Sequence, residues 1–140
     1  MVYEKSCGFV VYKEHQGERM YLIIRASNGD YGFPKGHVEG NETEYEAAIR
    51  ELKEETNVEV EIVDGFRHQI EYALPNKPNV IKQSVYFLGK CTAESIVCQE
   101  SEVSEAAFIT FDTALERLSF EDTKKILKKA DSYISTMVIE

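Results

Sequence analysis

The stretch GHVEGNETEYEAAIRELKEE, residues 36–55, decides the interpretation of this chain. It places a glycine-containing loop directly before a helix that we expect over residues 43–56. Glu51, Glu54 and Glu55 are spaced i, i+3 and i+4, so they share one face of that helix. Like charges at this spacing repel, and a hard divalent cation held by carboxylate oxygens would relieve the repulsion. A solvated acidic helix surface is the alternative interpretation of the same pattern.

The spacing of residues around this stretch resembles the Nudix box. The matching positions are Gly36, Glu42, Arg50, Glu51, Leu52, Glu54, Glu55 and Val58. The one departure is Asn57, where the family has glycine. Asparagine tolerates the left-handed backbone that often ends a helix, so the departure is mild. The resemblance implies a hydrolase that acts on phosphoanhydride bonds.

Length and periodicity predict one layered domain over residues 1–140, because the chain can build one core but not two. Apolar runs predict strands at 3–13, 20–26, 58–73, 79–91 and about 106–111. The long loop 27–42 is of a length that is usually functional. The resemblance implies an α/β fold, the Nudix-type α/β/α sandwich around a mixed β-sheet, with the box as loop-helix-loop.

Both expected helices have an apolar side. In the box helix we expect Tyr45, Ala48, Ile49 and Leu52 to pack on the sheet, with the glutamates turned toward a cleft. A second helix is expected from Ser119, a capping candidate with Asp122 at N3. Its apolar side is Ile126, Leu127, Ala130, Ile134 and Met137, which predicts a packing role without chemistry.

Composition excludes several classes of protein. The net charge of −9 and pI near 4.9 disfavour non-specific nucleic-acid binding, so no nucleic-acid partner is expected. No apolar run is long enough for a transmembrane helix, and no membrane partner is expected. The N-terminus has no pattern of a secretory signal, and three widely spaced cysteines favour reduced thiols in a cytoplasmic protein. Monomer and homodimer both remain open.

The resemblance also implies the metal site and its chemistry. Glu51, Glu54 and Glu55 would hold Mg²⁺ or Mn²⁺, and Arg50 would orient them through ion pairs. Glu42 is expected to brace the loop against the helix N-terminus, where a carboxylate is favoured.

The resemblance also implies a fourth acidic ligand downstream of the box. Glu102 is the candidate, with Glu100 and Glu105 as neighbouring alternatives. The predicted catalytic set is therefore Glu54, Glu51, Arg50 and Glu102, and the predicted metal set is Glu51, Glu54, Glu55 and Glu102.

Segments outside the box resemble the asymmetric diadenosine tetraphosphate hydrolases. The resemblance covers FPKGHVE at 33–39, GFR at 65–67, Tyr72, and NKP at 76–78, in the same order along the chain. It implies that Lys35, His37 and Lys77 contact the phosphate chain and that Tyr72 stacks on adenine. An ordinary strand tyrosine, a solvent-exposed lysine and a loop-bonded histidine are the alternative interpretations.

One position departs from this group of hydrolases. Where they place a second aromatic against the base, this chain offers Ala106. One of the two aromatic contacts to the base is then missing, or Tyr31, Tyr86 or Phe108 supplies it.

The function that these patterns predict is metal-dependent hydrolysis of a dinucleoside polyphosphate, with diadenosine tetraphosphate yielding ATP and AMP. Another nucleoside polyphosphate, such as a nucleoside triphosphate or an RNA 5′-triphosphate, is the alternative substrate. A Nudix module that binds nucleotide without cleaving it is the alternative outside enzymes, and it conflicts with the intact set of glutamates.

Overall fold

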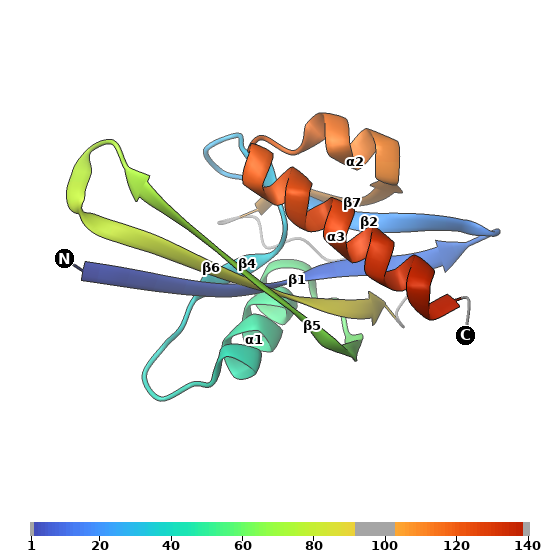
Figure 1. Ribbon diagram of the computed structural model, residues 1–140, viewed down its shortest axis with the longest axis horizontal. Helices are drawn as coiled ribbons and strands as arrows, with labels where there is room; N and C mark the ends of the chain where they lie inside the picture. Colours follow the sequence, from blue (N-terminus) through green and yellow to red (C-terminus); the bar gives the residue numbers. More distant parts are fainter. Residues whose placement is uncertain (1, 92–102, 139–140) are drawn as a thin grey trace.

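The computed structural model describes residues 2–91 and 103–138 (Figure 1). Its elements are β1 (Val2–His15), β2 (Glu18–Ala26), β3 (Tyr31–Gly32), β4 (Lys35–His37), α1 (Glu44–Thr56), β5 (Val60–Leu74), β6 (Lys77–Cys91), β7 (Val103–Thr110), α2 (Phe111–Arg117) and α3 (Glu121–Val138). Every predicted strand and helix is present. Three short elements were not predicted: β3 and β4 inside the long loop, and α2, whose N-cap Thr110 accepts a hydrogen bond from the Thr113 N–H.

The strands form one mixed sheet in the order β3-β2-β1-β6-β5, with β4 also paired to β1 and β7 to β2. β1 and β6 run parallel from Val2↔Val80 to Tyr12↔Lys90, and the other pairings are antiparallel. The pairing of β4 with β1 fixes the loop that precedes α1. A side chain at Gly8 would overlap the Pro34 carbonyl oxygen, so glycine there permits this close approach.

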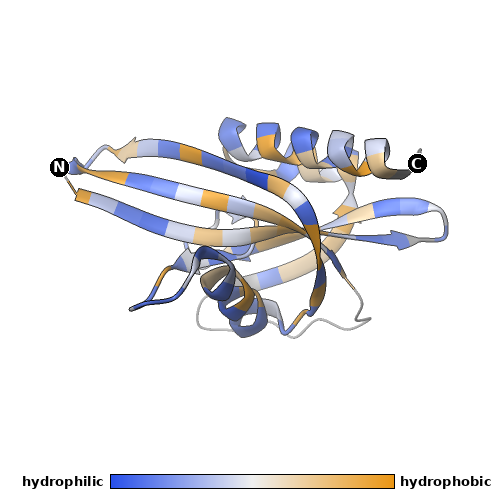
Figure 2. Ribbon diagram, turned by 60° about the horizontal axis from the view of Figure 1, so that its bottom comes forward, coloured by the Kyte–Doolittle hydropathy of each residue, from blue (hydrophilic) through white to orange (hydrophobic). Residues whose placement is uncertain are grey.

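Helices cover both faces of the sheet, as in the predicted α/β/α sandwich: α3 lies on one side and α1 on the other (Figure 2). Alternation along β1 supplies both cores, because successive side chains point to opposite faces. Phe9 and Val11 pack with α1, while Val10 and Tyr12 pack with α3. No helix in the described segments has the length and hydropathy required to cross a membrane.

Of the four residues of α1 expected to pack on the sheet, two are buried and two are not. Ala48 and Leu52 are buried, but Tyr45 and Ile49 are 37% and 45% exposed. The buried face is rotated toward the carboxylates: Glu51 and Glu55 are 8% and 6% exposed. Small alanines at 47 and 48 allow the close contact with the sheet that produces this rotation. Two of the three glutamates are therefore held inside the fold.

Two expectations for α3 were also wrong. Ser119 does not cap it: the Ser119 hydroxyl accepts a hydrogen bond from the Tyr31 N–H at 2.9 Å, and the Ser119 N–H donates to the Tyr31 carbonyl at 3.2 Å. Met137 is 41% exposed, whereas the other residues of the predicted apolar side are buried. The chain before α3 is thus tied to β3.

Candidate functional site

Both ends of α1 are fixed by its own sequence. Thr43 and Glu46 form a reciprocal capping box, with hydrogen bonds of 3.1 and 2.8 Å. At the other end Asn57 adopts the left-handed conformation at φ 56° and donates its N–H to the Lys53 carbonyl. Asparagine therefore fills the backbone role of the glycine expected at this position.

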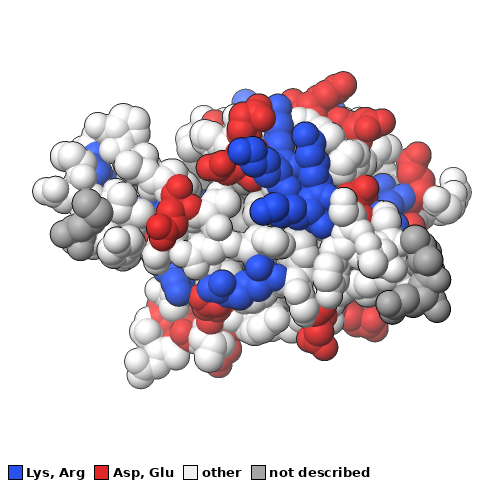
Figure 3. All heavy atoms as spheres, viewed as in Figure 1, with Lys and Arg blue, Asp and Glu red and all other residues white. Residues whose placement is uncertain are grey.

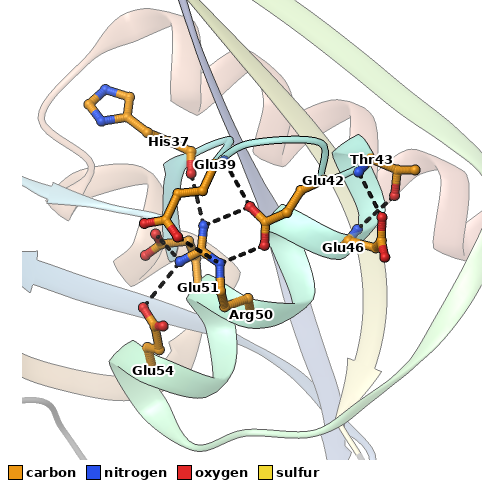
Figure 4. A network of polar contacts seen from close by, with 8 residues as sticks. All are labelled: His37, Glu39, Glu42, Thr43, Glu46, Arg50, Glu51 and Glu54. Carbon is orange, nitrogen blue, oxygen red and sulfur yellow. Dashed lines mark hydrogen bonds and ion pairs between the residues drawn. The ribbon is translucent and has the colours of Figure 1, made fainter.

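Arg50 is the centre of a polar network on α1 (Figure 4). Its guanidinium donates to both oxygens of Glu42 at 2.7 and 3.0 Å, to Glu51 at 2.8 Å and to Glu54 at 3.3 Å. It also donates to the His37 carbonyl at 2.9 Å, which connects α1 to β4. The hydrogen bond to Glu42 is the main reason that the pKa of Arg50 is raised, so this cation is permanent. Ion pairs were predicted for Arg50 with Glu51, Glu54 and Glu55, and those with Glu51 and Glu54 are present.

Glu42 has the bracing position that the sequence suggested. Besides its two bonds from Arg50, it accepts the Glu39 N–H at 2.8 Å. The same Arg50 contacts lower the pKa of the Glu42 carboxyl. Glu42 thus joins the loop to the helix.

Gly36 leaves space for one of the predicted metal ligands. A Cβ atom built at Gly36 would overlap the carboxylate of Glu51, so any side chain on β4 would displace it. The pairing Cys7↔Gly36 holds β4 at this position. The carboxylate of Glu51 therefore depends on a glycine fifteen residues earlier as well as on Arg50.

The donor set fits a hard divalent cation in its chemistry, since Mg²⁺ takes a few carboxylate oxygens and retains water. Within the described residues, however, no three acidic, histidine or cysteine side chains converge into a metal site. Glu51 and Glu54 are instead held by Arg50. Glu102 and Glu100 lie outside the described residues, and Glu105 is on β7 opposite Arg25.

A cavity of about 490 Å³ lies next to α1, of a size typical of small-molecule sites. Its wall includes Lys35, Tyr72 and Glu55, so it joins two predicted substrate contacts to a predicted metal ligand. The Lys35 ammonium lies 5.8 Å from the centroid of the Tyr72 ring and donates to Ser84 at 3.0 Å. Burial opposes the charge of Lys35, but the adjacent hydroxyls of Tyr86 and Tyr72 outweigh it, so the pKa lies above its ordinary value. Lys35 is a charged group in a mostly apolar space.

His37 and Lys77 are not among the described residues that line this cavity. The His37 ring points away from the carboxylates in Figure 4, and its Nε2 lies 2.9 Å from the Lys82 ammonium and 3.9 Å from Glu4. Lys77 is exposed at the start of β6. The pKa of Glu4 is lowered, first by Lys82 and further by Lys77 and His37. Lys77, Lys82 and the His37 imidazole form a second polar group, outside the cavity lining.

Aromatic side chains make much of the cavity wall. Of the proposed substitutes for a second base contact, Tyr31 and Tyr86 line the cavity, while Phe108 packs on the α1 side of the sheet beneath Lys13. Phe120, which sequence reasoning missed, also lines it and is 56% exposed. The available signal was a large apolar residue directly before the polar start of a helix.

Positive charge gathers elsewhere, over the outer surface of α3 (Figure 3). Lys128 and Lys129 line a shallow hollow of about 470 Å³ with His68, whose pKa is lowered by burial and by Lys129. Neither lysine lines the cavity beside α1 within the described part of the chain.

Comparison with known proteins decides the family. The NUDIX domain family matches residues 3–130. The chain belongs to the Nudix family. The resemblance stated from the box and the α/β/α fold are confirmed, and this Nudix protein is a hydrolase of phosphoanhydride bonds.

Its relatives are of similar length. The Nudix chain is 26% identical over 142 residues to the asymmetrical bis(5′-nucleosyl)-tetraphosphatase of Mus musculus, covering 93% of this chain and 95% of that protein. The Caenorhabditis elegans protein of the same name is 28% identical over 136 residues, covering 94% and 96%. The crystal structure of a C. elegans Ap4A hydrolase binary complex superposes with a TM-score of 0.87 at 25% identity, covering 95% and 98%.

Proposed function

We propose that this Nudix hydrolase cleaves dinucleoside polyphosphates asymmetrically, converting diadenosine tetraphosphate to ATP and AMP with Mg²⁺ or Mn²⁺. The observation that carries the proposal is that one cavity is lined by an aromatic ring, Tyr72, a partly buried cation, Lys35, and a carboxylate of the box helix, Glu55. The names of the Mus musculus and C. elegans relatives support the same substrate class.

Different residues of the cavity suit the base and the phosphates of the substrate. Tyr72 is partly exposed on β5, so its ring is available for stacking, which contributes about 1–3 kcal/mol per base. Lys35 is held by Ser84 on β6, which places its ammonium in the cavity wall as a point charge for a phosphate oxygen. The second polar group, with His37, Lys77 and Lys82, is available to the part of a long polyphosphate that extends out of the cavity.

The reaction consumes one water. Its oxygen attacks the phosphorus nearest one adenosine, the anhydride P–O bond on the far side of that phosphorus breaks, and the products are AMP and ATP. A divalent cation held by Glu51, Glu54 and Glu55 would neutralise charge on the phosphate oxygens. Arg50 keeps Glu51 and Glu54 in fixed orientations, and a box carboxylate or Glu102 accepts the proton of the water.

Product analysis tests the proposal. The protein is incubated with Mg²⁺ and with Mn²⁺ against diadenosine tetraphosphate, ATP, ADP-ribose and a 5′-triphosphorylated oligonucleotide, and the products are separated by chromatography. We expect ATP plus AMP from the first substrate, formed faster than the products of the other three. Faster turnover of one of the others would overturn the substrate assignment, and symmetric cleavage to two ADP would overturn the position of attack.

A further inference from the structure

The cavity has an unusual balance of charge for a site that binds a polyanion. Of its described lining residues, Lys35 is the one lysine or arginine, whereas Asp30, Glu55 and Asp122 are carboxylates. Glu55 belongs to the box helix, but Asp30 and Asp122 come from the β2–β3 loop and the first turn of α3. Carboxylates repel phosphate oxygens, so Asp30 and Asp122 suit contact with a part of the substrate other than its phosphates.

Hydrogen bonds fix the wall that carries these two aspartates. The Asp30 N–H donates to Asn28 Oδ1 at 2.9 Å, and the Asp30 carbonyl accepts the Ala26 N–H at 2.8 Å. The two bonds between Tyr31 and Ser119 then tie this loop to the connection that carries Phe120 and leads to Asp122. Asp30, which is partly buried, and Asp122, which is exposed, therefore come from braced backbone next to the aromatic residues of the same cavity.

A carboxylate only accepts hydrogen bonds, so it selects a base edge that presents donors. Guanine offers N1–H beside its N2 amino group, two adjacent donors that match the two oxygens of a carboxylate. Adenine offers one amino group between ring-nitrogen acceptors, which face a carboxylate unfavourably. With Asn28 Oδ1 already bonded to Asp30, the side-chain amide of Asn28 contributes a donor, which suits the guanine O6 or N7.

We propose that the cavity of this hydrolase prefers guanine to adenine, with Asp30 accepting from the N1–H and N2–H groups, Asp122 reinforcing that edge, and Phe120 supplying the second aromatic contact. The inference rests on the proposed function in taking this cavity as the base site. It makes the preferred substrate a guanosine-containing dinucleoside polyphosphate, and diadenosine tetraphosphate a slower substrate of the same reaction.

The test compares kcat/KM for diguanosine tetraphosphate and diadenosine tetraphosphate. We expect the guanosine compound to be favoured about tenfold in the unmodified protein, since a good bidentate contact discriminates by ~1–3 kcal/mol. Asp30→Asn should remove most of this preference by slowing the guanosine compound, and Asp122→Asn should reduce it less. Asp112→Asn is the matched control, because Asp112 lies in the first turn of α2 and is not among the described lining residues.

Binding of GMP and AMP, measured by calorimetry, separates this inference from the proposed function. Turnover of both dinucleotides without a guanine preference, or equal losses for both in Asp30→Asn, would overturn the inference and leave the proposed function intact. Tighter binding of GMP that depends on Asp30, without turnover of either dinucleotide, would uphold the inference and overturn the proposed function. Thermal unfolding of each variant shows whether a loss reflects the fold.

Discussion

The box helix and the cavity beside it are built in opposite ways. On α1, the polar network from Glu42 to Glu54 is crosslinked by one side chain, Arg50, and spans thirteen residues of sequence. The cavity collects its wall from β2, the loop after it, β3, β4, α1, β5, β6, the connection into α3 and the first turn of α3. In this molecule the described groups expected to do chemistry are local in sequence, with Glu102 as a further candidate outside the box, while those expected to choose the substrate are dispersed over the fold.

This difference has a consequence for mutation. A change in the α1 network should affect every substrate alike, because it acts on groups common to the reaction. A change in the cavity wall should affect substrates unequally and leave the rate for a tightly bound substrate closer to normal.

Replacing the glutamates of α1 should have the largest effect. Glu54→Gln and Glu55→Gln keep the side-chain volume but remove the charge, and we expect each to lower kcat by at least about 100-fold for all substrates. Steady-state kinetics over a range of Mg²⁺ concentrations measures this, with Glu59→Gln, an exposed glutamate just after α1, as the control. Near-normal turnover in both variants would remove α1 from the catalytic site.

Gly36→Ala should have the next largest effect on activity. The added Cβ displaces the Glu51 carboxylate, so we expect kcat to fall about 10- to 100-fold and the protein to lose roughly 1–3 kcal/mol of stability from overpacking. A double-mutant cycle with Glu51→Ala, followed by denaturant unfolding, isolates this contact. The second change should recover stability and leave activity low; independent, additive losses of stability would show that the two residues do not compete for space.

Tyr72→Ala should act on the cavity alone. Loss of base stacking predicts a rise in KM of about tenfold, with a smaller change in kcat, since the stacking contribution is ~1–3 kcal/mol. Tyr72→Phe should be close to normal, and Tyr3→Ala, an exposed tyrosine on β1, provides the control. An equal fall in kcat for every dinucleotide, with KM unchanged, would contradict the separation of the two regions.

The smallest effect concerns the attachment of α1 to the sheet. Glu44 accepts from Lys5 at 2.8 Å and from Arg67 at 2.9 Å, and chiefly the Arg67 hydrogen bond lowers the pKa of Glu44 to about 2. A lowered pKa means that this stabilisation is fully present above the unfolded value near 4.5 and is lost as pH falls toward 2.

Denaturant unfolding between pH 7 and pH 2 measures that contribution. Glu44→Gln should destabilise the protein by about 1 kcal/mol at neutral pH, given the partial exposure of these groups, and the difference should disappear in acid. A difference that persists at the lowest pH would assign the effect to packing.

Features of the local network on α1 could be predicted from the sequence, whereas those that depend on the tertiary fold could not. The ion pairs of Arg50 were predictable from the resemblance of the box, and the left-handed Asn57 from the backbone chemistry of a helix end, because both depend on residues close together in sequence. The exposure of Tyr45 and Ile49 was not, because it depends on how closely the alanines of α1 approach the sheet. Phe120 could not be placed beside Tyr72, since 48 positions separate them and only the tertiary fold brings both to one cavity.

The pairing of β4 with β1 also constrains how this chain can change length. Side chains alternate across a strand, so Gly36 faces Glu51 while its neighbour Lys35 reaches the cavity. Insertion or deletion of one residue within β4 would exchange those faces. Lys35 would then turn toward α1, and a residue larger than glycine would face Glu51. The loop before β3 can absorb such changes, so we expect natural length variation among close relatives at 27–30, and none from β4 to Glu42, because the box fixes the spacing between Gly36 and Glu42.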